Sequence, residues 1–120
     1  MIESFANTET MSIEKLPPIH PGEILWEDFM QPLGLSEQQV AQDLTVSPIQ
    51  ISQIIQGKQG ITVDIAMRLA HYFGTSAVVW LRLQARYDLE VAQEKMGERI
   101  KNEVKVLTMP HVMNKAWQLV

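Results

Sequence analysis

Hydroxyl and carboxamide side chains gather between residues 36 and 58, where they alternate with small and branched apolar residues. Ser47, Gln50 and Gln53 recur every third residue, which places them near one another on a helix. Such groups donate and accept hydrogen bonds and carry no strong nucleophile or base. This stretch therefore favours recognition of a polar surface over catalysis.

Reactive groups elsewhere do not form a catalytic pattern. His20, His71 and His111 are too far apart in sequence for their spacing to predict a metal site, and there is no cysteine. Glu27 and Asp28 are adjacent, so their side chains diverge around a helix. No phosphate-binding loop, nucleophile elbow or HExxH motif is present. We expect neither an enzyme nor a cofactor or metal site, and we expect His20 to cap or pack near the first helix.

Caps, glycines and prolines predict where helices begin and end. The first helix is expected to begin at Pro21 and to be stopped by Pro32. Ser36 is an expected N-cap, with Gln39 completing a capping box. Further N-caps are expected at Ser47, Thr62 and Ser76, and ends at Gly57 and Gly74.

These signals predict an all-α fold of five helices without a strand. The last helix is long, with a polar continuation over residues 90–103 in which charges alternate in sign. The expected spans are about 21–30, 36–44, 48–56, 63–73 and 77–103.

Residues 35–58 are typical of two short helices that share a small core across a tight turn. Ala41 allows the helices to approach closely, Val46 fills the turn, and Ile51 and Ile54 anchor the second helix. The N-terminal end of that second helix then faces outward, and in helix-turn-helix proteins this end enters the major groove of DNA. An αα-hairpin of a plain bundle, with glutamines exposed for solubility, is the alternative.

The outward residues suit DNA. The Gln53 carboxamide can contact adenine in bidentate fashion, Ile49 can touch a thymine methyl, and backbone amides near Ser47 can hold phosphate. The expected DNA-contacting residues are Ser36, Glu37, Ser47, Pro48, Ile49, Gln50, Gln53 and Lys58.

The chain resembles the Cro/repressor (XRE) type of helix-turn-helix protein over residues 35–58, and the HigA or VapI-like antitoxins over about residues 18–94. The resemblance implies a homodimer that binds operator DNA, represses its own operon and neutralises a HigB-like toxin, a ribonuclease of the RelE type. The segments that carry it are residues 20–25, 32–36, 57–58, 61–62, 66–70, 72–76, 80–81, 83–84 and 87–89.

The candidate interface departs from that class in charge. Pro48 and Ile49 stand where relatives often have Arg, Lys or Gln, and Glu37 stands where a residue that contacts phosphate is common. Lys58 is the only base between residues 36 and 62. Two alternatives therefore stay open: a protein-interaction module with weak or no operator binding, and a phage-type regulator without a toxin.

Composition limits the chain to one domain with tails. Its 120 residues are 46% hydrophobic, and we expect a flexible arm at 1–17, the helix-turn-helix domain at 18–94 and a helical extension and tail at 95–120. The net charge of −4 is polarised, with −6 on residues 1–60 and +2 on residues 61–120, which suits a basic partner. With no signal peptide and no long apolar run, a cytoplasmic protein without membrane contact is expected.

The fifth helix has two interpretations. Trp80, Leu83, Tyr87 and Leu89 fit either the core of one chain or a dimer contact. Arg68, Arg82 and Arg86 fit either phosphate contacts or ion pairs with the acidic helices. The amphipathic segment 109–120 fits docking on a partner or a frayed end, and residues 1–16 are a second candidate for toxin contact.

Overall fold

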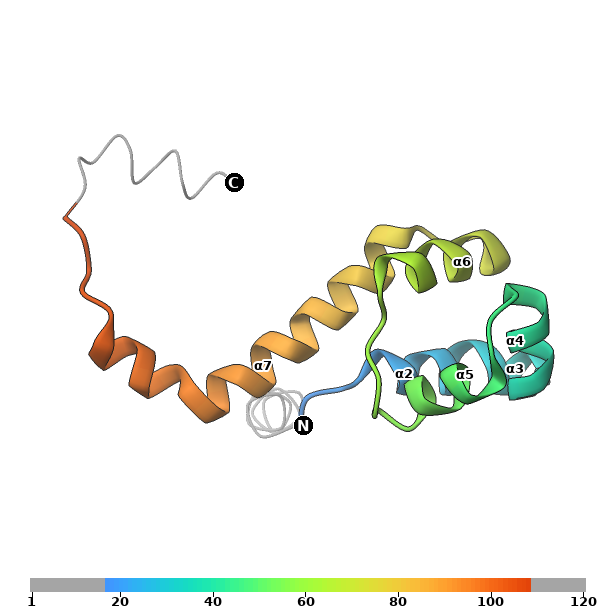
Figure 1. Ribbon diagram of the computed structural model, residues 1–120, viewed down its shortest axis with the longest axis horizontal. Helices are drawn as coiled ribbons and strands as arrows, with labels where there is room; N and C mark the ends of the chain where they lie inside the picture. The colour runs from blue at the N-terminus through green and yellow to red at the C-terminus, as the bar shows by residue number, and fades with distance from the viewer. Residues whose placement is uncertain (1–16, 109–120) are drawn as a thin grey trace, which may run out of the picture.

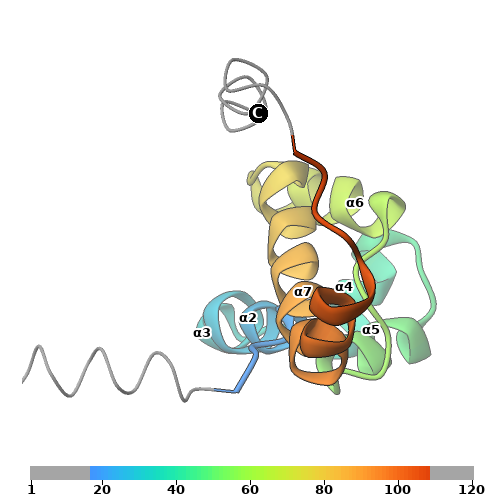
Figure 2. The same cartoon turned by 90° about the vertical axis from the view of Figure 1, so that its left-hand side faces the viewer.

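The computed structural model describes residues 17–108, which contain helices and no strand. The expected all-α fold with a long C-terminal helix is confirmed, and that helix leaves the bundle in its second half (Figures 1 and 2). Most of the expected arm and the tail from residue 109 lie outside the described residues. The elements are α2 (Pro21–Ile24), η1 (Leu25–Met30), α3 (Gln31–Leu33), α4 (Glu37–Leu44), α5 (Pro48–Ile55), α6 (Val63–Phe73) and α7 (Ala77–Glu103).

The four later helices begin at the N-caps predicted from the sequence. In each, a hydroxyl oxygen accepts a hydrogen bond from a backbone N–H of the first turn. The expected capping box is only half formed, because the Gln39 carboxamide donates to Asp43 at 2.9 Å and does not accept a hydrogen bond from the Ser36 backbone N–H. The caps are Ser36, Ser47, Thr62 and Ser76.

The expected stop at Pro32 is wrong. The chain passes from α2 through the π-helical turn η1 into α3. This continuous helical segment ends only at Gly34, whose φ is 66°. Proline in a regular α-helix crowds the carbonyl four residues back. Here the preceding turn is wider, with Gln31 N–H bonded to Trp26 O five residues back, and this wider turn accommodates Pro32.

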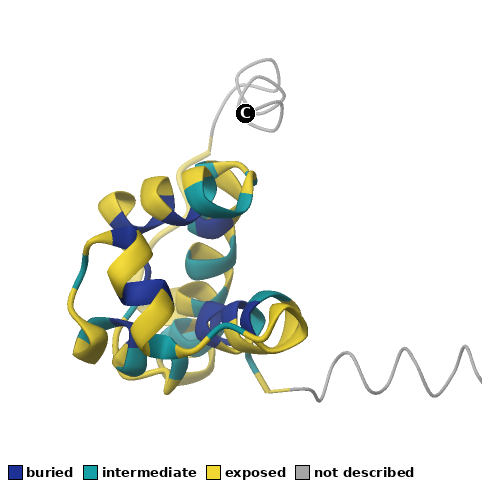
Figure 3. Cartoon of the chain, turned by 90° about the vertical axis from the view of Figure 1, so that its right-hand side faces the viewer, coloured by how far each residue is buried: buried dark blue, intermediate teal, exposed yellow. Residues whose placement is uncertain are grey.

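The core lies where α2–α3, α4, α5, α6 and the start of α7 meet (Figure 3). Trp80 closes it: its side chain is 1% exposed, its ring lies 5.2 Å from Phe29, and its Nε1–H donates to Thr75 at 2.8 Å. Within the described residues, the hydrophobic core consists of residues that are each at most 5% exposed: Leu25, Met30, Val40, Ala41, Leu44, Ile51, Ile54, Ile61, Ile65, Ala66, Leu69 and Trp80.

α7 is a single helix through residue 94, where the sequence suggests a domain boundary. It packs against α6 and α2 near its start. Among residues 17–108, no helix is both long and apolar enough to cross a lipid bilayer.

His20 caps the first helical segment, as the sequence predicts. Its Nδ1 accepts a hydrogen bond from Gly22 N–H at 2.9 Å, and its side chain is buried, with 7% of the residue exposed. An Nδ1 that accepts must be unprotonated. Burial lowers the pKa of His20 below 6.5, although the nearby carboxylates of Asp88 and Glu23 oppose that shift.

The cap makes stability depend on pH. Because the folded chain binds the His20 proton less readily than the unfolded chain, the stabilisation is complete above pH 6.5 and is lost as the pH falls through the lower folded pKa. Urea unfolding at pH 7.5 and pH 5.5 should show a loss of stability that is smaller in His20→Asn, which keeps an acceptor at the cap but does not titrate. His71→Asn, at an exposed position, is the matched control. Equal pH dependence in the wild type and His20→Asn would contradict this role.

Candidate nucleic-acid interface

A three-residue turn joins α4 to α5. Thr45 ends α4 in the left-handed conformation, with φ 60° and ψ 49°, a region that a β-branched residue rarely adopts. Val46 N–H donates to Ala41 O at 2.9 Å, and the Val46 side chain packs against the core as predicted. Ser47 then caps α5 through Gln50 N–H at 3.2 Å. The turn thus fixes the direction in which α5 leaves α4.

α5 separates an inner from an outer face. Ile51 and Ile54 are fully buried, whereas Ile49 is 69% exposed and Pro48 and Gln53 are also exposed. Gln50 is half-buried. The outer face of α5 therefore presents an apolar side chain and a free carboxamide next to the capped N-terminus.

The start of α4 carries two further residues predicted to contact DNA, Ser36 and Glu37. The Ser36 hydroxyl accepts from Gln39 N–H at 3.0 Å, so its own proton remains available to an acceptor such as phosphate. Glu37 follows in the first turn and is half-buried. A carboxylate at this end is favourable for the helix but repels phosphate.

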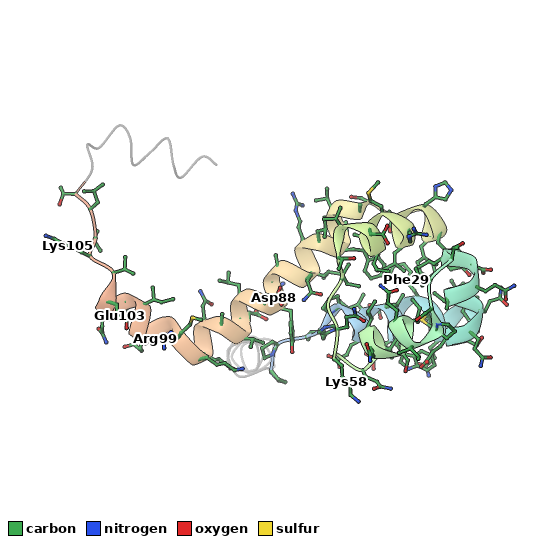
Figure 4. All side chains as sticks on the ribbon, viewed as in Figure 1. Phe29, Lys58, Asp88, Arg99, Glu103 and Lys105 are labelled. Carbon is green, nitrogen blue, oxygen red and sulfur yellow. The ribbon has the colours of Figure 1, made fainter. Side chains whose placement is uncertain are left out.

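α5 ends in a reversal that places Lys58. Gly57 adopts a φ of 77°, and the Gln53 carbonyl accepts hydrogen bonds from the N–H groups of Lys58 at 2.8 Å and Gln59 at 3.2 Å. Lys58 is exposed, at the edge of the bundle in Figure 4. The predicted DNA-contacting residues thus fall into three places: the start of α4, the outer face of α5 and the turn after it.

The remaining charges near the turn are held within the chain. Arg68 donates to Leu44 O at 2.8 Å and to Asp64 at 2.9 Å, so it ties α6 to the end of α4. Asp43 accepts from Gln39 and Tyr72; these two hydrogen bonds lower the pKa of Asp43, and the bond to Asp43 raises the pKa of Tyr72 to about 12. The described residues hold no cluster of three or more acidic or histidine side chains that could bind a metal ion.

The predicted dimer residues lie mainly inside one chain. Trp80 belongs to the core, and Leu83 is half-buried and packs against that core. The half-buried Tyr87 ring meets His20 edge-on, at 4.8 Å between ring centres. Sequence reasoning gave no role to Gln84, although an amide one turn after Trp80, on the inward side of α7, is a signal of a buried hydrogen bond.

This geometry defines the class of the protein: a helix-turn-helix DNA-binding domain of the Cro/repressor type. Residues 27–80 match the helix-turn-helix family. The chain is 48% identical over 93 residues to virulence-associated protein I of Dichelobacter nodosus. The match covers 78% of this chain and 82% of that protein.

Solved structures of similar proteins indicate the same family. The Pseudomonas aeruginosa antitoxin HigA, determined with the higBA promoter, is 40% identical with a TM-score of 0.74, and the match covers 76% of this chain and 99% of that one. An addiction module antidote protein of the HigA family from Coxiella burnetii is also 40% identical, with a TM-score of 0.73 over 77% of this chain and all of that one. The chain therefore belongs to the HigA family of helix-turn-helix antitoxins and transcriptional regulators, which includes VapI-like relatives.

Proposed function

We propose that this protein acts as a homodimer that represses its own operon and neutralises a RelE-like ribonuclease toxin of the HigB type by binding it. The observation that carries the DNA-binding half is the outer face of α5, where Ile49 and Gln53 project from a capped helix start. The related HigA structure was determined with promoter DNA, which supports the same role here.

Base reading would come from α5. The Gln53 carboxamide can pair with an adenine edge, and Ile49 can pack against a thymine methyl. Ser36, Ser47 and the adjacent backbone amides would position the phosphate backbone, with Lys58 as the cation of this region. Pro48 and the half-buried Gln50 would shape the close approach, and Glu37 would weaken it.

Charge supports the toxin half of the proposal. Glu23, Glu27 and Asp28 are exposed on the first helical segment, and residues 17–57 contain no Lys or Arg. Such a face complements a basic protein, as a ribonuclease that binds RNA would be.

The second half of α7 supports self-association. Leu89, Ala92, Met96 and Ile100 form a stripe at helical spacing, which we call the distal stripe. Leu89 is 58% and Ile100 45% exposed, and the stripe lines a depression of about 300 Å³. By helical spacing it lies nearly opposite Leu83 and Tyr87. We therefore propose the dimer contact on the distal stripe, which includes Leu89, and not on Trp80, Leu83 and Tyr87.

The scarcity of bases favours a second candidate function, a protein-interaction module with weak operator binding. Lys58 is the only cation between residues 36 and 62, and Glu37 opposes phosphate. Measured selectivity for operator DNA distinguishes the two candidates.

Gln53→Ala tests base reading. The loss of a bidentate base contact should weaken binding to the upstream DNA by about 5- to 150-fold and reduce discrimination against scrambled DNA. Fluorescence anisotropy titrations at two salt concentrations measure both quantities. Gln31→Ala, at an exposed glutamine on α3 outside both the proposed DNA interface and the distal stripe, is the matched control and should bind as the wild type does. A wild-type protein that binds both DNAs equally would support the interaction module instead.

Met96→Glu tests the dimer contact. A carboxylate buried between two distal stripes is unfavourable without a partner, so this variant should sediment as a monomer at micromolar concentration. Lys95→Glu introduces the same group at an exposed neighbouring position and should leave the dimer intact. Sedimentation equilibrium gives the masses, and a dimeric Met96→Glu protein would exclude the distal stripe as the contact.

A further inference from the structure

The loop between α5 and α6, residues 56–62, is held by a side chain from a distant part of the chain. The Gln84 carboxamide oxygen on α7 accepts a hydrogen bond from Ile61 N–H at 2.7 Å. The two residues are 23 positions apart, and Gln84 lies on the turn of α7 that follows Trp80. The same loop carries Lys58 at its exposed side (Figure 4).

The Gln84 side chain is fixed at both of its polar atoms. Its Nε2 donates to Asp88 Oδ1 at 2.9 Å, one helical turn further along α7. Gly60 lies directly on the carboxamide, because a Cβ there would come within 3.0 Å of the Gln84 Cδ and Oε1 atoms. The contacts of the Gln84 carboxamide with Gly60 and Ile61 therefore constrain the backbone path of the loop.

α7 reaches the other end of the loop through His20. The Tyr87 ring meets the His20 ring at 4.8 Å and 74°. The far side of that histidine lies near Gly57, where a Cβ would be 3.7 Å from His20 Cγ. One stretch of α7, from Gln84 to Asp88, thus supports the loop at the end of α5 and again just before α6.

We propose that Gln84 is a positioning residue for operator binding. By fixing the path of residues 56–62, it sets where Lys58 meets the DNA relative to the outer face of α5. α7, which also carries the distal stripe, is thereby energetically coupled to the DNA interface. This inference rests on the proposed operator binding.

Three variants test it. Gln84→Leu keeps the approximate size of the side chain and removes both hydrogen bonds, and Gln31→Leu, at an exposed glutamine on α3, is the matched control. The double variant Gln84→Glu with Asp88→Asn restores both hydrogen bonds but exchanges donor and acceptor between positions 84 and 88. The carboxylate at position 84 accepts from Ile61 N–H and from the side-chain amide at position 88.

Two measurements are made on each full-length protein. Hydrogen exchange of the Ile61 amide is measured in the free protein, and affinity for the upstream DNA is measured by titration. In Gln84→Leu we expect exchange at Ile61 to rise about fivefold and affinity to fall about fivefold, the size of one net hydrogen bond. The double variant should return both values to within about twofold of the wild type, and Gln31→Leu should change neither.

Three outcomes would contradict the proposed role of Gln84. Faster exchange at Ile61 with unchanged affinity would show that Gln84 supports the fold but not the interface. If Gln84→Leu fails to fold, a folded double variant with lowered affinity would equally overturn the proposal. A wild-type protein that does not prefer its upstream DNA would remove the proposed operator binding, and this inference with it.

Discussion

The close approach of the first helical segment to the C-terminal end of α5 is the constraint on which the rest of the structure depends. A Cβ at Gly22 would lie 1.8 Å from the Ile54 carbonyl oxygen, so the two backbones touch there and only glycine fits. His20 caps this segment and meets the Tyr87 ring edge-on, and Gly57 turns the chain beside it. Contacts within the chain therefore hold the C-terminal end of α5, while the turn at Thr45 directs its N-terminal end.

These contacts matter for the proposed DNA interface, because that surface has little positive charge to attract DNA. Most DNA-binding surfaces gain affinity from many Lys and Arg contacts to phosphate. Here Lys58 is the one base between residues 36 and 62, and Arg68 is used to join α6 to α4. Affinity must then come from hydrogen bonds and shape, which require that donors and acceptors be placed in advance. The hydrogen bonds that hold the turn and the loop supply that placement.

Local signals predicted most of the fold. The hydroxyl caps at Ser36, Ser47, Thr62 and Ser76 act within one helical turn, so the sequence alone identifies them. The same holds for the inward isoleucines of α5. The end of the first helix was predicted wrongly at Pro32. The π-helical turn η1 that accommodates this proline is an irregular helix geometry that residue types do not specify.

Contacts between distant residues could not be predicted in this way. Gln84 and Ile61 meet only after α6 and α7 have packed together, and the pairing of Tyr87 with His20 joins the two ends of the domain. Trp80 was left undecided between core and dimer contact for the same reason, since spacing on a helix does not reveal what covers it. The predicted DNA-contacting residues follow from the turn itself, which is local.

The central claim is that the N-terminal end of α5 and the loop after it face the operator. Amide chemical shifts of isotope-labelled protein, followed by NMR during titration with upstream DNA, test it directly. The account predicts that the largest changes fall on Ser47, Gln50, Gln53 and Lys58, with smaller ones at Ser36. Changes concentrated on the second half of α7, or on the acidic first helical segment, would contradict it.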